Sequence, residues 1–293
     1  MPSITRRITV ATLSLGALAG CHYSSAEQYD PSVWTWKGEL KSGTIHIRDL
    51  NGSIEVKPAT DDNVSVVASA RWHRGDPKND VKYQVASSGS DVTICALWDE
   101  GICSPNGGYT TRGNFLSKFL RKQNDVAVSF TVLVPTGVQV DVKTVNGSIS
   151  VFATAPVKAR NVNGGIKVAT AVGPVDAETV NGNVDARMTT IGGDGPVSAK
   201  TVNGTAKLYV PQNLDADVSL ETLNGSLASD FALSGEDGNT RHHLRGLVGR
   251  GGRRVRAVSL NGGSAIHMLN TDGTVATPGT VAAATAARAA VKP

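Results

Sequence analysis

The sequence predicts an all-β fold: a repeat β-solenoid, similar to a parallel β-helix, with about seven strand–Asn-Gly–strand units. First, Asn-Gly recurs in one fixed context, and its five central copies are 17, 18, 22 and 21 residues apart; a period near twenty is typical of repeat architectures. Second, apolar and polar residues alternate on both sides of each Asn-Gly, as in strands with one buried face. Third, the apolar positions hold mainly Val, Ala, Ile and Leu and no aromatic residue, which suits a narrow core.

Each repeat turn is an Asn-Gly pair that follows Val or Leu. The turn residues are Asn51, Gly52, Asn146, Gly147, Asn163, Gly164, Asn181, Gly182, Asn203, Gly204, Asn224, Gly225, Asn261 and Gly262. Asn-Gly between alternating strands also predicts a type I′ hairpin, so an antiparallel hairpin meander or sandwich is the alternative. We favour the solenoid, in which each Asn-Gly is a corner and each coil pairs in parallel with the next.

Two polar columns of the repeat make further predictions. The position two before the asparagine is mostly short and polar: Thr144, Asn161, Thr179, Thr201, Thr222 and Ser259. At the position three before it, parallel coils about 4.8 Å apart would align alternating charges. That ladder would consist of Arg160, Glu178, Lys200 and Glu221. The alternative is a mixed, solvated face, since exposed ion pairs add little stability.

Residues 1–20 are expected to be a lipoprotein signal peptide. Arg6-Arg7 form a basic start, and the apolar stretch Ile8–Ala19 is too short to span a bilayer as a helix. The end of this stretch, Leu18-Ala19-Gly20-Cys21, resembles the bacterial lipobox, in which Cys21 would be lipidated as the first residue of the mature chain. The alternatives are cleavage by the ordinary signal peptidase and a twin-arginine export signal.

A polar tether is expected over residues 21–36, and it would hold the protein at a membrane through the lipid. The residue after Cys21 is His22, whereas an Asp at this position would resemble an inner-membrane retention signal. We therefore expect an exported, lipid-anchored protein of the outer membrane, on its periplasmic face or at the cell surface. The formal net charge of +4 is too small to indicate nucleic acid as a partner.

The β-repeat domain is expected over residues 37–270. Before the central repeats we expect longer strands at Val64–Trp72, Val81–Ala86, Asp91–Trp98 and Asp125–Val134. After the repeats, residues 271–293 are rich in Ala, Thr, Val and Gly without a clear period, which predicts a disordered tail.

An insertion at residues 99–124 interrupts the domain. If Cys21 carries lipid, Cys95 and Cys103 are the remaining cysteines, and an oxidising compartment favours a disulfide between them. Two cysteines with no nearby His would make only half of a zinc site. Within the insertion, Asn114–Lys122 is predicted to form one short amphipathic helix.

The repeated Thr-Val-Asn-Gly unit resembles the bacterial β-strand-repeat adhesin family, a group of envelope proteins whose molecular function is unknown. The closing segment from Leu244 to Gly252, followed by Leu260-Asn261-Gly262, is similar to the closing unit of that family and departs from it at Gly263-Ser264. The resemblance covers roughly residues 37–269. It implies a β-repeat fold and an envelope location, and it brings no catalytic residues.

The sequence contains no strong signature of a catalytic site. A β-helix can carry a carbohydrate-active enzyme, which needs carboxylates that converge on one face. The candidates are Asp141, Asp176, Asp185, Asp215 and Asp217. They stand in repeat columns, which solubility explains, so we predict no catalytic residue. No phosphate-binding loop, dinucleotide fingerprint or serine-hydrolase elbow is present, and no cofactor or metal is predicted.

One basic segment is a candidate anion-binding patch. It contains Arg241, Arg245, Arg250, Arg253, Arg254 and Arg256. Such a patch would bind an anionic glycan, phospholipid head groups or lipopolysaccharide, and the alternative is a solvated stretch with Gly-rich turns. Sugar-stacking residues would come from Trp34, Trp36, Trp72 and Trp98, although Trp72 and Trp98 could instead cover an end of the solenoid.

The sequence therefore predicts a non-catalytic envelope lipoprotein whose β-repeat surface serves adhesion or envelope scaffolding. Its partners would be the membrane, through the lipid, and a glycan, lipopolysaccharide or an envelope protein. The alternatives are a carbohydrate-active enzyme on the same fold and an accessory protein in envelope-stress signalling.

Overall fold

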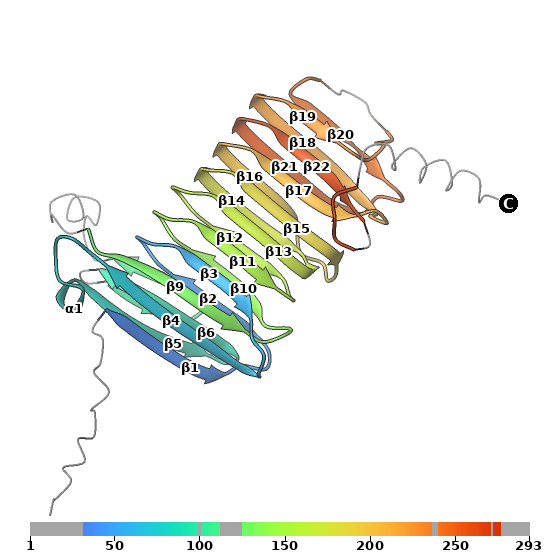
Figure 1. Cartoon of the computed structure of the whole chain (residues 1–293). Coiled ribbons are helices and arrows are strands. Elements are labelled where there is room, and N and C mark those ends of the chain that lie inside the picture. Colours follow the sequence, from blue (N-terminus) through green and yellow to red (C-terminus); the bar gives the residue numbers. More distant parts are fainter. Residues whose placement is uncertain (1–31, 99–100, 112–124, 236–239, 271, 277–293) are drawn as a thin grey trace, which may run out of the picture. The chain divides into compact units, whose positions relative to one another are not determined.

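The computed structural model describes residues 32–98, 101–111, 125–235, 240–270 and 272–276. They belong to one compact unit, Pro31–Pro293, in which two ten-stranded sheets face each other (Figure 1). Sheet A contains, in spatial order, β1 (Val33–Glu39), β4 (Asn63–Arg71), β9 (Ala127–Val134), β3 (Ile54–Pro58), β11 (Ile149–Ala153), β13 (Ile166–Gly173), β15 (Val184–Ile191), β17 (Ala206–Pro211), β22 (Ser264–Leu269) and β19 (Leu227–Ser229).

Sheet B contains, in spatial order, β20 (His243–Val248), β18 (Ala216–Asn224), β21 (Arg253–Asn261), β16 (Val197–Asn203), β14 (Val175–Asn181), β12 (Val157–Arg160), β10 (Gln139–Lys143), β2 (Thr44–Arg48), β6 (Asp91–Trp98) and β5 (Val81–Ser88). A separate hairpin is formed by β7 (Gly101–Ser104) and β8 (Gly108–Thr111). The short helix α1 (Pro77–Asp80) lies between β4 and β5.

The predicted solenoid is confirmed, and the antiparallel meander is not what the chain forms. Each unit contributes one strand to each sheet, and its Asn-Gly forms the corner between them. Equivalent strands pair in parallel at equivalent positions: Val140 aligns with Val157, and Val157 with Val175. The repeat period therefore sets the register of the pairing as well as the length of a coil.

The core lies between the two sheets and is built from the predicted apolar columns. Val140, Val157 and Val175 in sheet B, and Ile149 and Ile166 in sheet A, are at most 3% exposed. Burying one such side chain contributes about 1.5–3 kcal/mol. Because successive coils stack the same small side chains, the core continues from coil to coil without a large aromatic residue.

Each corner requires glycine, because the stacked corners approach closely. A Cβ atom on Gly182 would meet the carbonyl of Gly164, and one on Gly204 would meet the carbonyl of Gly182. The neighbouring asparagines form an amide ladder along the corners. Its bonds run from Nδ2 to Oδ1 for Asn163–Asn146, Asn181–Asn163, Asn203–Asn181, Asn261–Asn203 and Asn224–Asn261, at 2.7–2.9 Å.

The short polar column also has a structural role. Its hydroxyl groups donate to the glycine carbonyl of the adjacent corner, as Thr201 does to Gly182 at 2.7 Å and Ser259 does to Gly204 at 2.7 Å. In the first unit the same column position holds Asp49, which is 3% exposed. Burial raises the pKa of Asp49 to about 8.

Coils at the C-terminal end do not stack in sequence order. The last unit, β21 and β22, lies between β16/β17 and β18/β19. The predicted charge ladder is therefore wrong beyond its third member. Arg160 aligns with Glu178 and Glu178 with Lys200, but Lys200 and Glu221 each align with Val258. Ser264, at the departure from the family pattern, is buried and donates to the Glu221 carbonyl at 2.7 Å.

The N-terminal end is built from longer strands without Asn-Gly corners. Strands β6 and β9 extend the parallel pairing by one level, and β5 and β4 then pair antiparallel to them. Strand β1 pairs antiparallel with β4 at the edge. Trp34 stacks on Tyr83 at 5.0 Å between ring centroids, and Tyr83 meets Phe130 edge-on at 6.5 Å. Aromatic side chains thus close the core at this end.

Two predicted boundaries need correction. Residues 33–36, assigned to the tether, lie in β1, because Trp34 and Trp36 pack against the core. The start of the predicted tail is also ordered, since Val275 forms a bridge with Leu269 and Ala276 is buried. The signal peptide with Cys21, the rest of the tether, the helix 114–122 and residues 277–293 lie outside the described residues.

Candidate functional site

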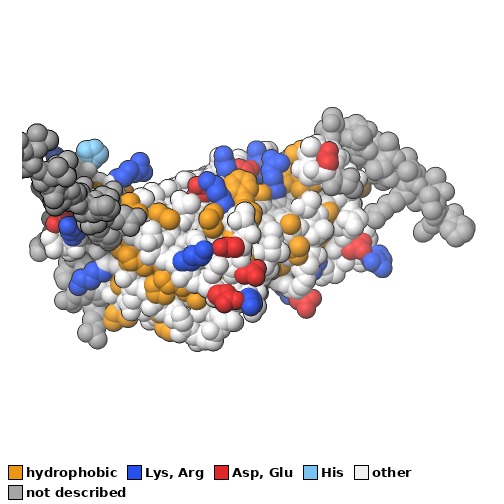
Figure 2. Space-filling view, turned by 60° about the horizontal axis from the view of Figure 1, so that its bottom comes forward, with side chains coloured by type: hydrophobic (Ala, Val, Ile, Leu, Met, Phe, Trp, Pro, Cys, Tyr) orange, Lys and Arg blue, Asp and Glu red, His pale blue; other side chains and the backbone are white. Residues whose placement is uncertain are grey.

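Charged side chains gather on the outer faces of the sheets, because the inner positions of the strands are mostly apolar. Figure 2 shows both signs of charge interspersed with polar and hydrophobic surface on one face of the molecule. On sheet B, strand pairing places the outward side chains in rows that cross the sheet. Two clusters of interacting charges lie in these rows, one toward the N-terminal end of the stack of coils and one toward its C-terminal end.

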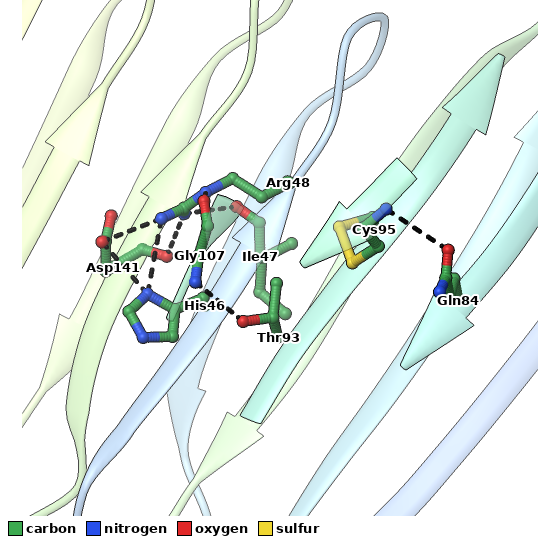
Figure 3. Close-up of a disulfide and its surroundings, with 9 residues drawn as sticks. His46, Ile47, Arg48, Gln84, Thr93, Cys95, Gly107 and Asp141 are labelled. Carbon is green, nitrogen blue, oxygen red and sulfur yellow. Dashed lines mark hydrogen bonds and ion pairs between the residues drawn. A yellow bond between two sulfur atoms is a disulfide. The ribbon is translucent and has the colours of Figure 1, made fainter. Parts of the chain in front are cut away.

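The first cluster lies on β2 and β10 (Figure 3). Arg48 donates to Asp141 at 2.9 Å, and His46 Nδ1 lies 3.1 Å from the same carboxylate oxygen. His46 and Arg48 are only 7% and 6% exposed. Burial alone would raise the pKa of Asp141, but the His46 hydrogen bond and the charge of Arg48 outweigh it and lower the pKa to about 2.

This first cluster is covered by the β7–β8 hairpin. Arg48 Nε donates to the Gly107 carbonyl at 2.7 Å, and the Gly107 N–H donates to Thr93 at 2.9 Å. The expected disulfide is present, joining Cys95 on β6 to Cys103 on β7 with 5.9 Å between their Cα atoms. The hairpin is thus attached to sheet B by one covalent bond and by the buried arginine, and this cluster holds the fold together.

The second cluster surrounds a hollow of about 1050 Å³ on the outer face of sheet B. Strands β14, β16, β21, β18 and β20 contribute to it, together with the loop 192–196. Its charged lining residues are Lys200, Arg245, Arg253, Arg254, Arg256, Asp176, Asp194 and Asp217. Five basic and three acidic side chains leave a positive balance of two charges.

The floor of the hollow is one row of sheet B. Strand pairing aligns Asp176 with Ser198, Ser198 with Arg256, Arg256 with Ser219, and Ser219 with Arg245. Ser198 is 6% exposed, and its Oγ has no hydrogen-bond partner within the described part of the chain. Adjacent strands lie about 4.8 Å apart, so the row extends roughly 19 Å.

The cations of the hollow are only partly neutralised. Glu221 accepts from Arg256 at 2.7 Å and lies 3.7 Å from Arg245, so one carboxylate serves two guanidinium groups. Burial would raise the pKa of Glu221, but hydrogen bonds from Arg256 and Ser219 outweigh it and lower the pKa. Lys200 and Arg254 form no ion pair with any described residue.

One wall of the hollow is fixed by an arginine. Arg253 donates to the Gly195 carbonyl at 3.1 Å and also to the Gly193 carbonyl. These contacts attach the loop 192–196 to β21. Asp217, on another side, accepts from the Gly252 N–H at 3.0 Å. The walls of the hollow are therefore held by backbone contacts as well as by side chains.

The structure divides the predicted basic patch. Four of its arginines, Arg245, Arg253, Arg254 and Arg256, line the hollow. Arg241 instead donates to His242 at 2.8 Å, and Arg250 pairs with Asp215 at 2.8 Å outside the lining. The sequence does not indicate that Lys200 and Ser198 lie beside this patch, because nothing in the repeat columns shows which unit is their neighbour.

The candidate catalytic aspartates do not converge. Asp141 belongs to the first cluster, Asp185 lies on sheet A, and Asp215 pairs with Arg250. Asp176 and Asp217 both line the hollow, but three strand steps separate β14 from β18, which is at least about 14 Å. Paired carboxylates of inverting glycosidases lie about 6.5–9.5 Å apart and those of retaining ones closer.

The tryptophans provide one exposed ring. Trp98 is 3% exposed and offers no free ring face, while Trp34 and Trp36 are partly buried against the core. Trp72 is 41% exposed and lies just after β4, away from the hollow. A sugar in the hollow would therefore have no aromatic ring to stack on among the described lining residues.

Two further searches cover only the described residues. No helix there is long and apolar enough to cross a membrane. In the same ranges, no group of three or more His, Cys, Asp or Glu side chains is placed to hold a metal ion.

Comparison with known proteins finds one matching family. The model of the Toastrack DUF4097 family matches residues 128–266 of this chain. The resemblance to a β-repeat adhesin family of unknown function is thereby confirmed. The matched range contains the central coils, the hollow and the first half of β22.

Solved structures were also compared. A "putative cell adhesion protein" from Clostridium sporogenes is 13% identical, with 82% of this chain and 100% of that chain covered and a TM-score of 0.42. A "putative adhesin" from Bacteroides fragilis is 10% identical, with 82% and 98% covered and a TM-score of 0.34. Among curated proteins, none matches the chain.

Proposed function

We propose that this protein is a non-catalytic lipoprotein of the cell envelope whose stacked coils present a binding surface for adhesion or envelope scaffolding. The hollow on sheet B is the observation that carries the proposal. It combines incompletely neutralised cations with a buried hydroxyl that has no hydrogen-bond partner among the described residues, on a row of hydrogen-bonded strands. A surface already ordered in this way loses little conformational entropy when it binds.

The proposed location follows from the N-terminal sequence. The lipobox-like Leu18–Cys21 would attach the chain to a membrane through lipid on Cys21, and the polar residues that follow would separate the domain from the bilayer. His22 favours the outer membrane. Lipid attachment is testable directly, because Cys21→Ser would leave the chain unmodified and release it from the membrane fraction.

A carbohydrate-active enzyme is the second candidate. The three aspartates that line the hollow favour it, since acids beside a bound sugar are what such chemistry needs. Against it, Asp176 is held by Arg160, and Asp217 accepts from a backbone N–H. The spacing of the strands also places these two carboxylates at least about 14 Å apart, farther than the paired carboxylates of glycosidases.

One experiment tests both candidates. The chain from His22 to Pro293, without lipid, would be passed over immobilised glycans, peptidoglycan and lipopolysaccharide, and both retention and cleavage products would be measured. Saturable retention without products is the expected result. Products would overturn the non-catalytic proposal. Absence of retention on every surface would overturn the glycan-binding form of the proposal and favour a protein partner in the envelope.

A further inference from the structure

We infer that the hollow on sheet B binds an anionic saccharide, a sugar chain that carries carboxylate or phosphate groups, with Ser198 on the floor of the site. The inference rests on the proposed binding function and names its ligand. It depends on three observations: the unpartnered hydroxyl of Ser198, the surplus of positive charge, and the alternation of acidic, hydroxyl and basic groups along one row.

Ser198 is the first observation. A buried polar group nearly always has a hydrogen-bond partner, and one without a partner needs an explanation. Ser198 is more than nine-tenths buried and lines the hollow, and its Oγ has no partner among the described residues. A ligand hydroxyl or acid oxygen in the hollow would supply the missing hydrogen bond.

The charge of the hollow indicates an anion. Lys200 and Arg254 have no ion pair with any described residue, while Arg256 pairs with Glu221, which also lies 3.7 Å from Arg245. The planar guanidinium group presents a fork of donors that fits both carboxylate and phosphate. A ligand acid group over β16 and β21 would therefore replace water around Lys200 and Arg254, the lining cations that have no ion pair among the described residues.

The acidic side chains indicate that the anion is carried by a saccharide. Asp176 stands next to Ser198 in the row, and Asp217 lies across from Arg254. These carboxylates would repel a uniform polyanion such as nucleic acid but would accept hydrogen bonds from sugar hydroxyls. The absence of an aromatic ring from the described lining also disfavours nucleobases, which stack on such rings.

Two pairs of probes that differ only in charge or in its source test this inference. An oligogalacturonate would be compared with its methyl ester, and a phosphorylated oligomannoside with the unphosphorylated oligomannoside. Calorimetry with the chain from His22 to Pro293 would measure each Kd at low and raised salt. The acidic member of at least one pair should bind at least about tenfold more tightly than its neutral partner, and salt should weaken that binding. The pair that shows the difference distinguishes a carboxylate source from a phosphate source.

Three variants locate the site. Arg254→Ala removes a cation that has no ion-pair partner in the described part of the chain, and Ser198→Ala removes the floor hydroxyl. Each should weaken binding of the acidic probe about tenfold. Arg250→Ala is the matched control, since it removes the same charge nearby but outside the lining, and it should leave the Kd unchanged. Circular dichroism would establish that all three variants are folded.

The outcomes separate this inference from the proposed function. Equal binding of acidic and neutral probes would overturn the anionic ligand while the proposed binding function stands. Tight binding of the acidic probe that Arg254→Ala and Ser198→Ala both leave unchanged would overturn the assignment to the hollow. If no acidic probe binds, the inference fails; if the wider glycan and envelope panel is also not retained, the proposed function fails with it.

Discussion

The central coils, from β10/β11 to β16/β17, differ from the two ends of the stack. In the centre, successive units follow one another in space as they do in sequence, and every pairing is parallel. At the ends, units are out of sequence order and antiparallel strands appear: β1, β4 and β5 at one end and β20 at the other. The same chain thus uses two ways of pairing its strands.

The difference shows where a repeat is sufficient and where it is not. A central strand has a copy of itself on each side, so one repeated pattern satisfies its backbone groups. A terminal strand has no next copy, and an open edge would expose unpaired N–H and C=O groups. At the C-terminal end, backbone bonds from Ser234 and Thr240 to β20 cover part of that edge. The ends therefore need sequence that the repeat does not supply.

The largest expected effect is at a central corner. Gly182→Ala should lower the free energy of unfolding by at least about 3 kcal/mol, because the new Cβ would meet the Gly164 carbonyl. Gly89→Ala is the control at the N-terminal end, where φ is also positive but no atom lies within 4 Å of the added Cβ. It should cost about 1 kcal/mol. Similar losses in urea unfolding would show that close approach is not what distinguishes the central corners.

The next effect concerns Asp49, which occupies the position of the short polar column in the first unit. Its pKa is raised, so the folded state retains a proton that the unfolded state loses above about pH 4, and stability falls as pH rises from about 4 to about 8. Asp49→Asn should remove this fall and stabilise the protein by about 2–3 kcal/mol at pH 8. Thermal unfolding across this pH range would measure it.

Asp141, which also lies toward the N-terminal end, is a control in which the pKa shift and the pH dependence of stability have the opposite sign. Its pKa is lowered to about 2, so its contribution is present above about pH 4 and is lost as pH falls toward 2. Asp141→Asn should therefore destabilise the protein at neutral pH. A stabilising Asp141→Asn, or an Asp49→Asn gain that does not grow with pH, would contradict these assignments.

The disulfide should matter at one end only. Replacing Cys95 and Cys103 together by Ala opens a short loop and should cost about 2 kcal/mol. Hydrogen exchange should accelerate in β6 and β7, while β14 and β16 keep their protection. Equal acceleration in the central strands would mean that the N-terminal end and the central coils unfold as one unit.

The smallest expected effect tests the short polar column. It asks whether the hydroxyl groups make the same hydrogen bonds in the coil β21/β22, which is stacked out of sequence order, as in the central coils. Thr201→Val in the centre and Ser259→Ala in the inserted unit each remove a donor to a corner carbonyl. Each should cost about 1 kcal/mol in urea unfolding. If only Thr201→Val were destabilising, the Ser259 hydrogen bond in the inserted unit β21/β22 would not contribute to stability as the Thr201 bond does.

The coil and its register could be predicted from the sequence, but the order of the coils could not. Alternation around each Asn-Gly defines which side chains are buried, and the fixed spacing defines which residues align. The neighbours of a coil are not encoded in these columns, because Val197, Val218 and Val255 occupy one column with the same side chain. Packing of identical residues does not distinguish one neighbour from another.

The candidate site was predictable in part for the same reason. The arginines of β20 and β21 stand out in sequence because they are clustered. Ser198 and Lys200 become part of the hollow only because β21, and not β18, lies beside β16. The sequence thus predicted the basic component of the site, while the floor depends on the stacking order.

The inserted position of β21 and β22 would have a consequence for folding after the proposed export. A chain that emerges from a secretion channel delivers residues 216–229 before residues 253–269, yet the later segment occupies the place next to β16 and β17. If β18 docked on β16 as soon as it emerged, Val218 would occupy the position that Val255 holds in the native stack. Glu221 would then lie beside Lys200, and the two charges would attract each other. Vectorial growth, one coil at a time, therefore does not lead to the native end, and the final coil has to arrive before its predecessor can settle.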